Sequence, residues 1–185
     1  IMPFQAIMPV IIRDILGRGP EDLGILMTAS GVGAFCGSIS VAVANELRRL
    51  STMMMMAGVG VGFILIFFSL SSIYPMSLLL AFALGLFVQM FMTSNFTLVQ
   101  MATPDEIRAR VISMRFIAIG LGPIGMISLG IAAEVYGPQP SLVVMAVINI
   151  ALVALIFIAM PAMRHAEAEV AAMAQNAEVE TTAVV

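Results

Sequence analysis

Five residues that can contact a small molecule recur at helical spacing between positions 89 and 100. They combine two amides, two hydroxyls and one aromatic ring: Gln89, Thr93, Phe96, Thr97 and Gln100. At about 100° per residue, their side chains fall within an arc of roughly 100° on one helix face. We call this set the polar stripe. The chemistry it offers is hydrogen bonding and stacking to a neutral or amphipathic solute.

Two interpretations of the polar stripe remain open. Its segment is otherwise apolar, and unpaired amides are costly in lipid, so the stripe must face protein or a water-filled cavity. If it faces protein, it needs no ligand, because hydrogen bonds between membrane helices average about 0.6 kcal/mol and are common. If it faces a cavity, these five residues are the candidates for solute contact. We expect Asn95, on another face of the helix, and Asn149 to make packing hydrogen bonds.

Arginines near the ends of apolar segments form a second group of interest. They can anchor the cytoplasmic ends of membrane helices. They can also close a gate by pairing with acids or with helix carboxyl ends elsewhere in the molecule. A capping box is predicted beside them, with Thr103 as the cap and Pro104 at the first helical position. The gate candidates are Glu106, Arg108, Arg110, Arg115, Arg48 and Arg49.

Reactive clusters are missing from the sequence. Cys36 is the only cysteine and His165 the only histidine, so no multi-cysteine metal site is expected. No Asp or Glu lies in the middle of an apolar segment, where a buried acid would be the default proton carrier. We therefore expect no enzymatic activity, no metal and no cofactor.

Composition places the chain in the membrane. It is 61% hydrophobic and 10% charged with a mean hydropathy of +1.09, whereas soluble domains carry about 25% charged residues. Its 17 methionines can fill an irregular core or line a cavity for variable ligands. The net charge of −3 arises mainly near the C-terminus, so it does not suggest nucleic acid as a partner.

The expected architecture is an all-α integral membrane bundle with one truncated helix and five complete ones. A transmembrane region is predicted over 1–163, followed by a soluble tail over 164–185. Because the first residue is apolar and no initiator methionine is present, we expect an upstream part of the protein to be missing. The truncated helix covers 1–12, and the complete spans cover about 23–44, 52–70, 78–101, 111–133 and 141–160.

Small residues predict where the helices pack closely or bend. Gly33 and Gly37 form a GxxxG pair, which lets two membrane helices approach closely. A second cluster, Gly120, Gly122, Pro123 and Gly125, is expected to thin and kink the fourth complete span.

The arginine distribution predicts the orientation of the spans. One set of connections holds six of the eight arginines, and the other holds only Arg13 and Arg18. The richer set, which includes Arg164, is expected on the cytoplasmic side, together with the C-terminus. Counting the truncated helix, the six helices divide into two triplets, each with a glycine-rich second helix. Such triplets would be inverted repeats in the membrane.

The segments LGILMTASGVGAFCGSI, ELRRLS, NFTLVQMATPDEIRARVISM and GLGPIGMISLGIAAEVYG together resemble the C-terminal half of a major facilitator superfamily transporter. Their nearest branch is the bacterial exporters of enterobactin-type siderophores and macrolides. The resemblance covers about 1–161. The family's Pro-x-x-x-Arg-Gly-Arg loop appears here with Ala109 in place of glycine, and its Asp-Arg and Gly-Arg turn is reduced to residues 45–49.

This resemblance implies half of a twelve-helix bundle, with the third complete span lining a central cavity shared with the missing N-terminal six-helix half. We predict alternating-access transport of a small amphipathic or lipophilic solute. The protein would be a drug or siderophore exporter in the bacterial inner membrane, acting as a proton-coupled antiporter. Its proton-carrying carboxylate would lie in the missing half. A non-transporting scaffold or sensor that retains the fold is the alternative.

Overall fold

The computed structural model describes residues 3–15, 17–44, 47–71 and 73–159, and every regular element in these ranges is an α-helix. The helices are α1 (Pro3–Asp14), α2 (Pro20–Ala42), α3 (Leu47–Leu70), α4 (Tyr74–Ala102), α5 (Asp105–Gly120), α6 (Gly122–Tyr136) and α7 (Pro138–Ala159). Five stretches are long and apolar enough to cross a membrane, with α5 and α6 together forming one of them. The predicted all-α membrane fold is therefore confirmed.

Some predicted features lie outside the described residues. These are Glu46, the last residue of the fifth span and the tail over 164–185, which contains Arg164 and His165. The side chain of Arg48 lies outside them as well.

Several helices continue beyond the span limits predicted from hydropathy. α3 begins at Leu47 instead of residue 52, and α4 begins at Tyr74 instead of residue 78. Backbone hydrogen bonding does not stop where the apolar sequence stops, so the helices extend into the polar turns. Pro20 and Pro75 lie in the first turns of α2 and α4, where a missing N–H costs no helical hydrogen bond.

The fourth crossing is two helices where the sequence predicted one over 111–133. α5 ends at Gly120 and α6 begins at Gly122, with Leu121 between them as the cap of α6. Pro123 lies in the first turn of α6 and has no N–H to donate to the preceding turn. The interruption thus falls within the predicted glycine and proline cluster.

The turn between α6 and α7 is a single residue, Gly137, in place of the longer turn predicted over 134–140. Gly137 has φ +92°, a backbone conformation that side chains other than glycine rarely adopt. α7 then begins at Pro138. The Ser69 hydroxyl donates to the Gln139 carbonyl over 2.8 Å and joins the end of α3 to the start of α7.

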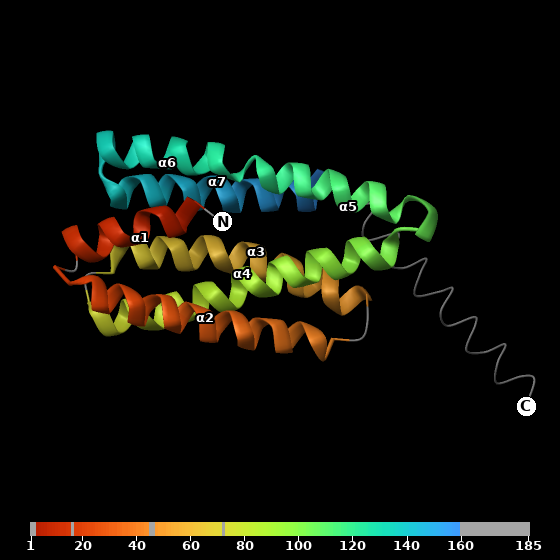
Figure 1. Ribbon diagram of the computed structural model, residues 1–185, viewed down its shortest axis with the longest axis horizontal. Coiled ribbons are helices and arrows are strands. Elements are labelled where there is room, and N and C mark those ends of the chain that lie inside the picture. The colour runs from red at the N-terminus through yellow and green to blue at the C-terminus, as the bar shows by residue number, and fades with distance from the viewer. Residues whose placement is uncertain (1–2, 16, 45–46, 72, 160–185) are drawn as a thin grey trace, which may run out of the picture.

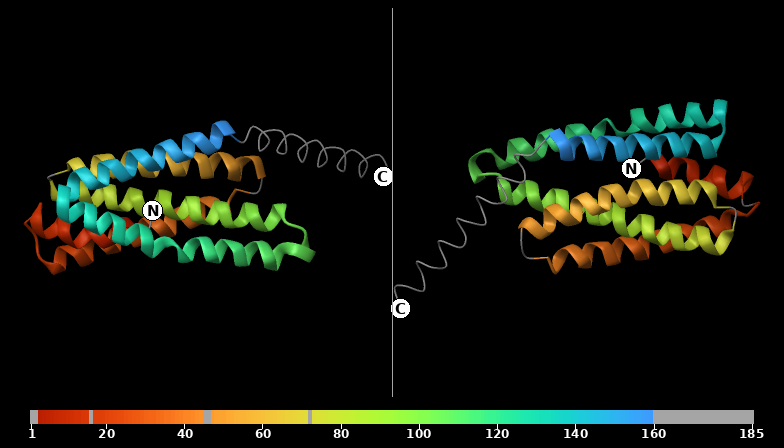
Figure 2. Two further views of the ribbon diagram at one scale, coloured as in Figure 1. Left: turned by 90° about the horizontal axis from the view of Figure 1, so that it is seen from above. Right: turned by 180° about the vertical axis from the view of Figure 1, so that it is seen from behind.

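The helices run roughly side by side along one long axis (Figure 1). α5, α6 and α7 lie along one side of the bundle and α2, α3 and α4 along the other, and α1 occupies the space between them at one end only (Figure 2). We call this end the α1 end. The opposite end, where α4 passes into α5, is the α5 end.

The buried core is larger at the α1 end. One cluster there takes residues from all six helices other than α5, including Met8, Leu26, Phe68, Leu84 and Leu142. A second, smaller cluster toward the α5 end uses α2, α3 and α4 only: Val41, Ala44, Leu50, Ala57 and Met90. One buried cluster thus draws on six helices at the α1 end, and the other draws on three toward the α5 end.

α2 and α4 form the most extensive helix pair in the bundle. Gly33 and Gly37 are buried against α4, and a Cβ atom on either would overlap the backbone carbonyl of Phe82 or Leu86. Gly85 on α4 lies equally close to the carbonyl of Ser30 on α2. Glycines on both helices thus allow backbone contact along this interface, as small residues do between membrane helices.

Candidate functional site

The polar stripe lies on the half of α4 that leads toward the α5 end. All five of its residues are half-buried, between the fully buried core and the exposed outer surface. α4 packs extensively on α2 and α3 but makes only slight contact with α5. The stripe is therefore shielded mainly by α2 and α3, and no residue of α4 between Leu80 and Gln100 is exposed.

The hydrogen bonding of the stripe is local. The Gln89 amide Nε2 donates to the Thr93 hydroxyl over 3.2 Å, one turn further along the same helix. Within the described residues, this amide is not used to tie α4 to another helix. The arrangement satisfies one amide donor and leaves the carbonyl oxygen of Gln89 available to another partner.

Asn95 differs from Gln89 in this respect. Its amide Nδ2 points toward α3 and lies 3.7 Å from the Met54 sulfur. This is a weak interhelical bond, because a thioether sulfur is a poor acceptor. These two amides of α4 thus have different surroundings: Asn95 is directed at a neighbouring helix, and Gln89 is bonded within α4.

Arg115 connects the stripe to α5. Its guanidinium carbon lies 4.8 Å from the centre of the Phe96 ring, a distance at which a cation is attracted to the face of an aromatic ring. Arg115 is half-buried. The sequence marked both residues as candidates, but with separate roles, because helical spacing describes one helix and cannot show that a residue on the next helix faces it.

Arg108 serves the junction between α4 and α5. One guanidinium nitrogen donates to the Thr103 carbonyl over 3.2 Å, and another pairs with Asp105 in the first turn of α5. The Thr103 hydroxyl donates back to the Val99 carbonyl over 2.6 Å. Thr103 is thus the C-cap of α4 and not the cap of α5, so the predicted capping box is replaced by an α4 terminus that Arg108 holds.

The other gate candidates in the described region are exposed at the α5 end. Glu106 and Arg110 lie on the first turns of α5, and Arg49 lies on the first turn of α3. Arg18 lies at the α1 end, where it is 3.7 Å from Asp22 and stacks on the Tyr74 ring at 4.8 Å. The described arginines are therefore divided between the two ends of the bundle.

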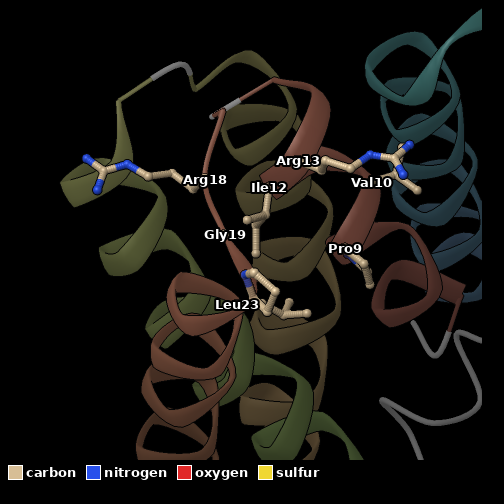
Figure 3. A pocket seen from close by; sticks show the side chains of 8 residues that line it. Pro9, Val10, Ile12, Arg13, Arg18, Gly19 and Leu23 are labelled. Atoms are coloured by element: carbon tan, nitrogen blue, oxygen red, sulfur yellow. The ribbon is translucent and has the colours of Figure 1, made fainter.

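Hollows on the surface lie away from the stripe. A groove of about 610 Å³ between α3, α4 and α7 is lined by Met55, Met56, Val59, Gly60, Phe63, Phe87, Val153 and Ala154. A smaller hollow of about 260 Å³ lies where α1 turns into α2. Figure 3 shows Arg13 and Arg18 projecting away from it on opposite sides, so its lining, which includes Pro9, Ile12 and Leu23, is mainly apolar.

Two further structural features were missed from the sequence. Gly85 is as important to the α2–α4 contact as Gly33 and Gly37, but it has no glycine four residues away to mark it. Ser94 is fully buried, and its hydroxyl has no hydrogen-bond partner among the described residues. Among those residues there is also no group of three side chains suited to holding a metal ion.

Comparison with protein families gives one match, to the family described as Major Facilitator Superfamily, over residues 2–182. The match covers nearly the whole chain and includes every helix described above. Comparisons with curated proteins and with solved structures found no match.

Proposed function

This chain belongs to the major facilitator superfamily of membrane transporters, and on that premise we propose that it forms one half of an exporter for small amphipathic or lipophilic solutes. Such a half works by alternating access around a site near the middle of the membrane. The second six-helix half would cover the open side of α4 and complete the cavity. Direction, substrate class and proton coupling are parts of this proposal.

The observation that carries the proposal is the surroundings of the polar stripe. Amides and hydroxyls recur along one face of an otherwise apolar membrane helix, where neighbouring helices of the chain leave them only half-buried. Gln89 bonds to Thr93 on its own helix, so helix packing does not account for its presence. A cavity that must desolvate and orient a solute does account for it, because such sites are mostly apolar with a few placed polar groups.

Proton coupling requires an acidic side chain within the membrane, and no acid of the described region lies in the middle of a crossing. The acidic side chains of the described region lie at helix ends and turns, as Glu21, Asp22, Asp105, Glu106 and Glu134 do. We propose that the proton-carrying carboxylate belongs to the other half of the transporter. A buried acid is the usual carrier in such proteins.

The arginines at the α5 end support a cytoplasmic orientation for that end. In this proposal Arg49, Arg108 and Arg110, with Arg48, lie where the two halves close on the cytoplasmic side. A membrane-impermeant thiol reagent should reach a cysteine at position 18 from outside intact cells, but not one at position 49. Labelling of position 49 from outside would reverse the orientation.

A substitution pair on α4 tests the solute-contact proposal. Gln89→Leu removes one of the two amides of the stripe, and Asn95→Leu removes the amide directed at α3. In the full-length transporter we expect Gln89→Leu to reduce the transport of some solutes while membrane abundance and melting temperature remain close to the parent. Asn95→Leu should lower stability by about 0.6 kcal/mol and affect all solutes alike.

The opposite pattern would contradict the proposal. If Gln89→Leu lowers the melting temperature and reduces all transport equally, then Gln89 is a packing residue. If neither variant changes the export of any tested solute, a non-transporting scaffold or sensor becomes the better explanation of the fold.

A further inference from the structure

Arg115 presents a positive charge to the polar stripe from the neighbouring helix. α5 begins at Asp105, so Arg115 lies ten residues, or about 15 Å, along the helix. Its guanidinium does not extend away from the bundle but lies over the Phe96 ring of α4. Arg115 lies a few residues inside the apolar segment predicted from residue 111, and an arginine held there against a neighbouring helix is a functional-site hypothesis by default.

No carboxylate of the described region balances this charge. Arg18 pairs with Asp22 and Arg108 with Asp105, and after Arg115 the next charged residue along the chain is Glu134. The contact with Phe96 attracts the cation but leaves it charged. The N–H edge of the guanidinium remains able to bind a carboxylate, sulfonate or phosphate through two parallel hydrogen bonds.

The positions of the charge and the amide limit the size of the ligand. Phe96 and Gln89 are seven residues apart on α4, which corresponds to about 10 Å along the helix. Gln89, Phe96 and Gln100 lie within about 40° of each other around the α4 axis. A ligand along this face would therefore meet a cation at one end and a neutral amide about 10 Å away.

From this juxtaposition we propose that Arg115 binds the anionic group of an amphipathic organic anion whose uncharged part lies along the polar stripe. The inference rests on the proposed function and narrows its substrate class from amphipathic solutes in general to anionic ones. Arg115 is then a substrate-binding residue, unlike Arg108, which holds the α4–α5 junction. Phe96 positions its guanidinium on the side of α4.

An anionic lipid headgroup offers the same chemistry as an anionic solute. Arginine side chains near membrane surfaces commonly reach toward lipid phosphates. The two sources separate experimentally, because only a solute-binding role makes the effect of Arg115 depend on the charge of the transported molecule in neutral lipid.

The test uses two fluorescent probes of one skeleton in the full-length transporter. Anilinonaphthalenesulfonate carries a sulfonate, and phenylnaphthylamine lacks it. Counterflow of each probe is measured in phosphatidylcholine vesicles, which need no coupling gradient and contain no net anionic lipid. The variants are Arg115→Gln, the charge-retaining Arg115→Lys, and Arg18→Gln as an exposed arginine control at the α1 end.

We expect Arg115→Gln to raise the half-saturation concentration for the sulfonate about 10- to 100-fold. This is the usual effect of losing a hydrogen bond to a charged group. Phenylnaphthylamine counterflow should change little, Arg115→Lys should recover part of the loss, and Arg18→Gln should behave like the parent. Equal losses for both probes, or a loss seen only when phosphatidylglycerol is added, would overturn the proposal.

The two probes also separate the anion site from the proposed export function in the parent protein. A parent protein that moves phenylnaphthylamine but not the sulfonate would contradict the anion site and retain the amphipathic exporter. A parent that moves neither probe would contradict both.

Discussion

The two ends of this bundle are built differently from the same helices. At the α1 end, six helices contribute to one buried cluster, and the Ser69 hydroxyl joins α3 to α7. At the α5 end, only α2, α3 and α4 share a buried cluster, while α4 and α5 make slight contact. The polar stripe of α4 lies toward this second end, so the proposed solute contacts would lie there.

The α2–α4 interface runs along both ends, and its disruption should have the largest effect. In Gly33→Leu the side chain would meet the backbone of α4 at Phe82, and a backbone carbonyl cannot move aside as a side chain can. We expect little folded protein in size-exclusion chromatography, since overpacking costs about 1–3 kcal/mol even where side chains can adjust.

Gly31→Leu is the matched control for this prediction. A Cβ at Gly31 meets no atom within 4 Å, although it lies on the same helix only two residues away. It should be recovered at the parent's yield. If Gly33→Leu is recovered equally well, the backbone contact between α2 and α4 is incidental to folding.

A leucine pair on α7 compares the two ends directly. Leu142 is fully buried at the α1 end, and Leu152 is 54% exposed further along the same helix. Leu142→Ala should destabilise the protein by about 2–5 kcal/mol through the cavity it leaves, whereas Leu152→Ala should be close to neutral. Thermal melting of the purified variants measures both. Equal losses would mean that the two ends are packed alike.

The sequence predicted the class of fold because composition and span length follow directly from the bilayer. It also indicated where the fourth crossing breaks, since Pro123 cannot donate a helical hydrogen bond. Helix limits were less well predicted. α3 and α4 begin at Leu47 and Tyr74, a turn or more before the starts predicted from hydropathy. Hydropathy reports the solvent around a segment and does not report its backbone hydrogen bonding.

The candidate site was predictable only within one helix. Period and residue type put Gln89 and Phe96 on one face, but nothing in the spacing placed Arg115 of the next helix over that ring. The different roles of Asn95 and Gln89 likewise depend on which helix lies opposite each amide. Such contacts between helices need the three-dimensional arrangement.

If the polar stripe of α4 faces a solute cavity, as proposed, a cysteine at position 93 should be accessible to water-soluble reagents. In a full-length transporter with Cys36 replaced by serine, a Thr93→Cys variant is treated with a small water-soluble methanethiosulfonate, with and without phenylnaphthylamine. A Phe67→Cys variant is the control, because Phe67 is 57% exposed on the apolar outer surface of α3.

We expect the Thr93→Cys variant to react, its rate to fall as the site fills with solute, and the Phe67→Cys variant to stay unreactive in lipid. A Thr93→Cys variant that is unreactive, or that reacts at a rate independent of solute, would contradict the cavity and favour a fold retained without transport.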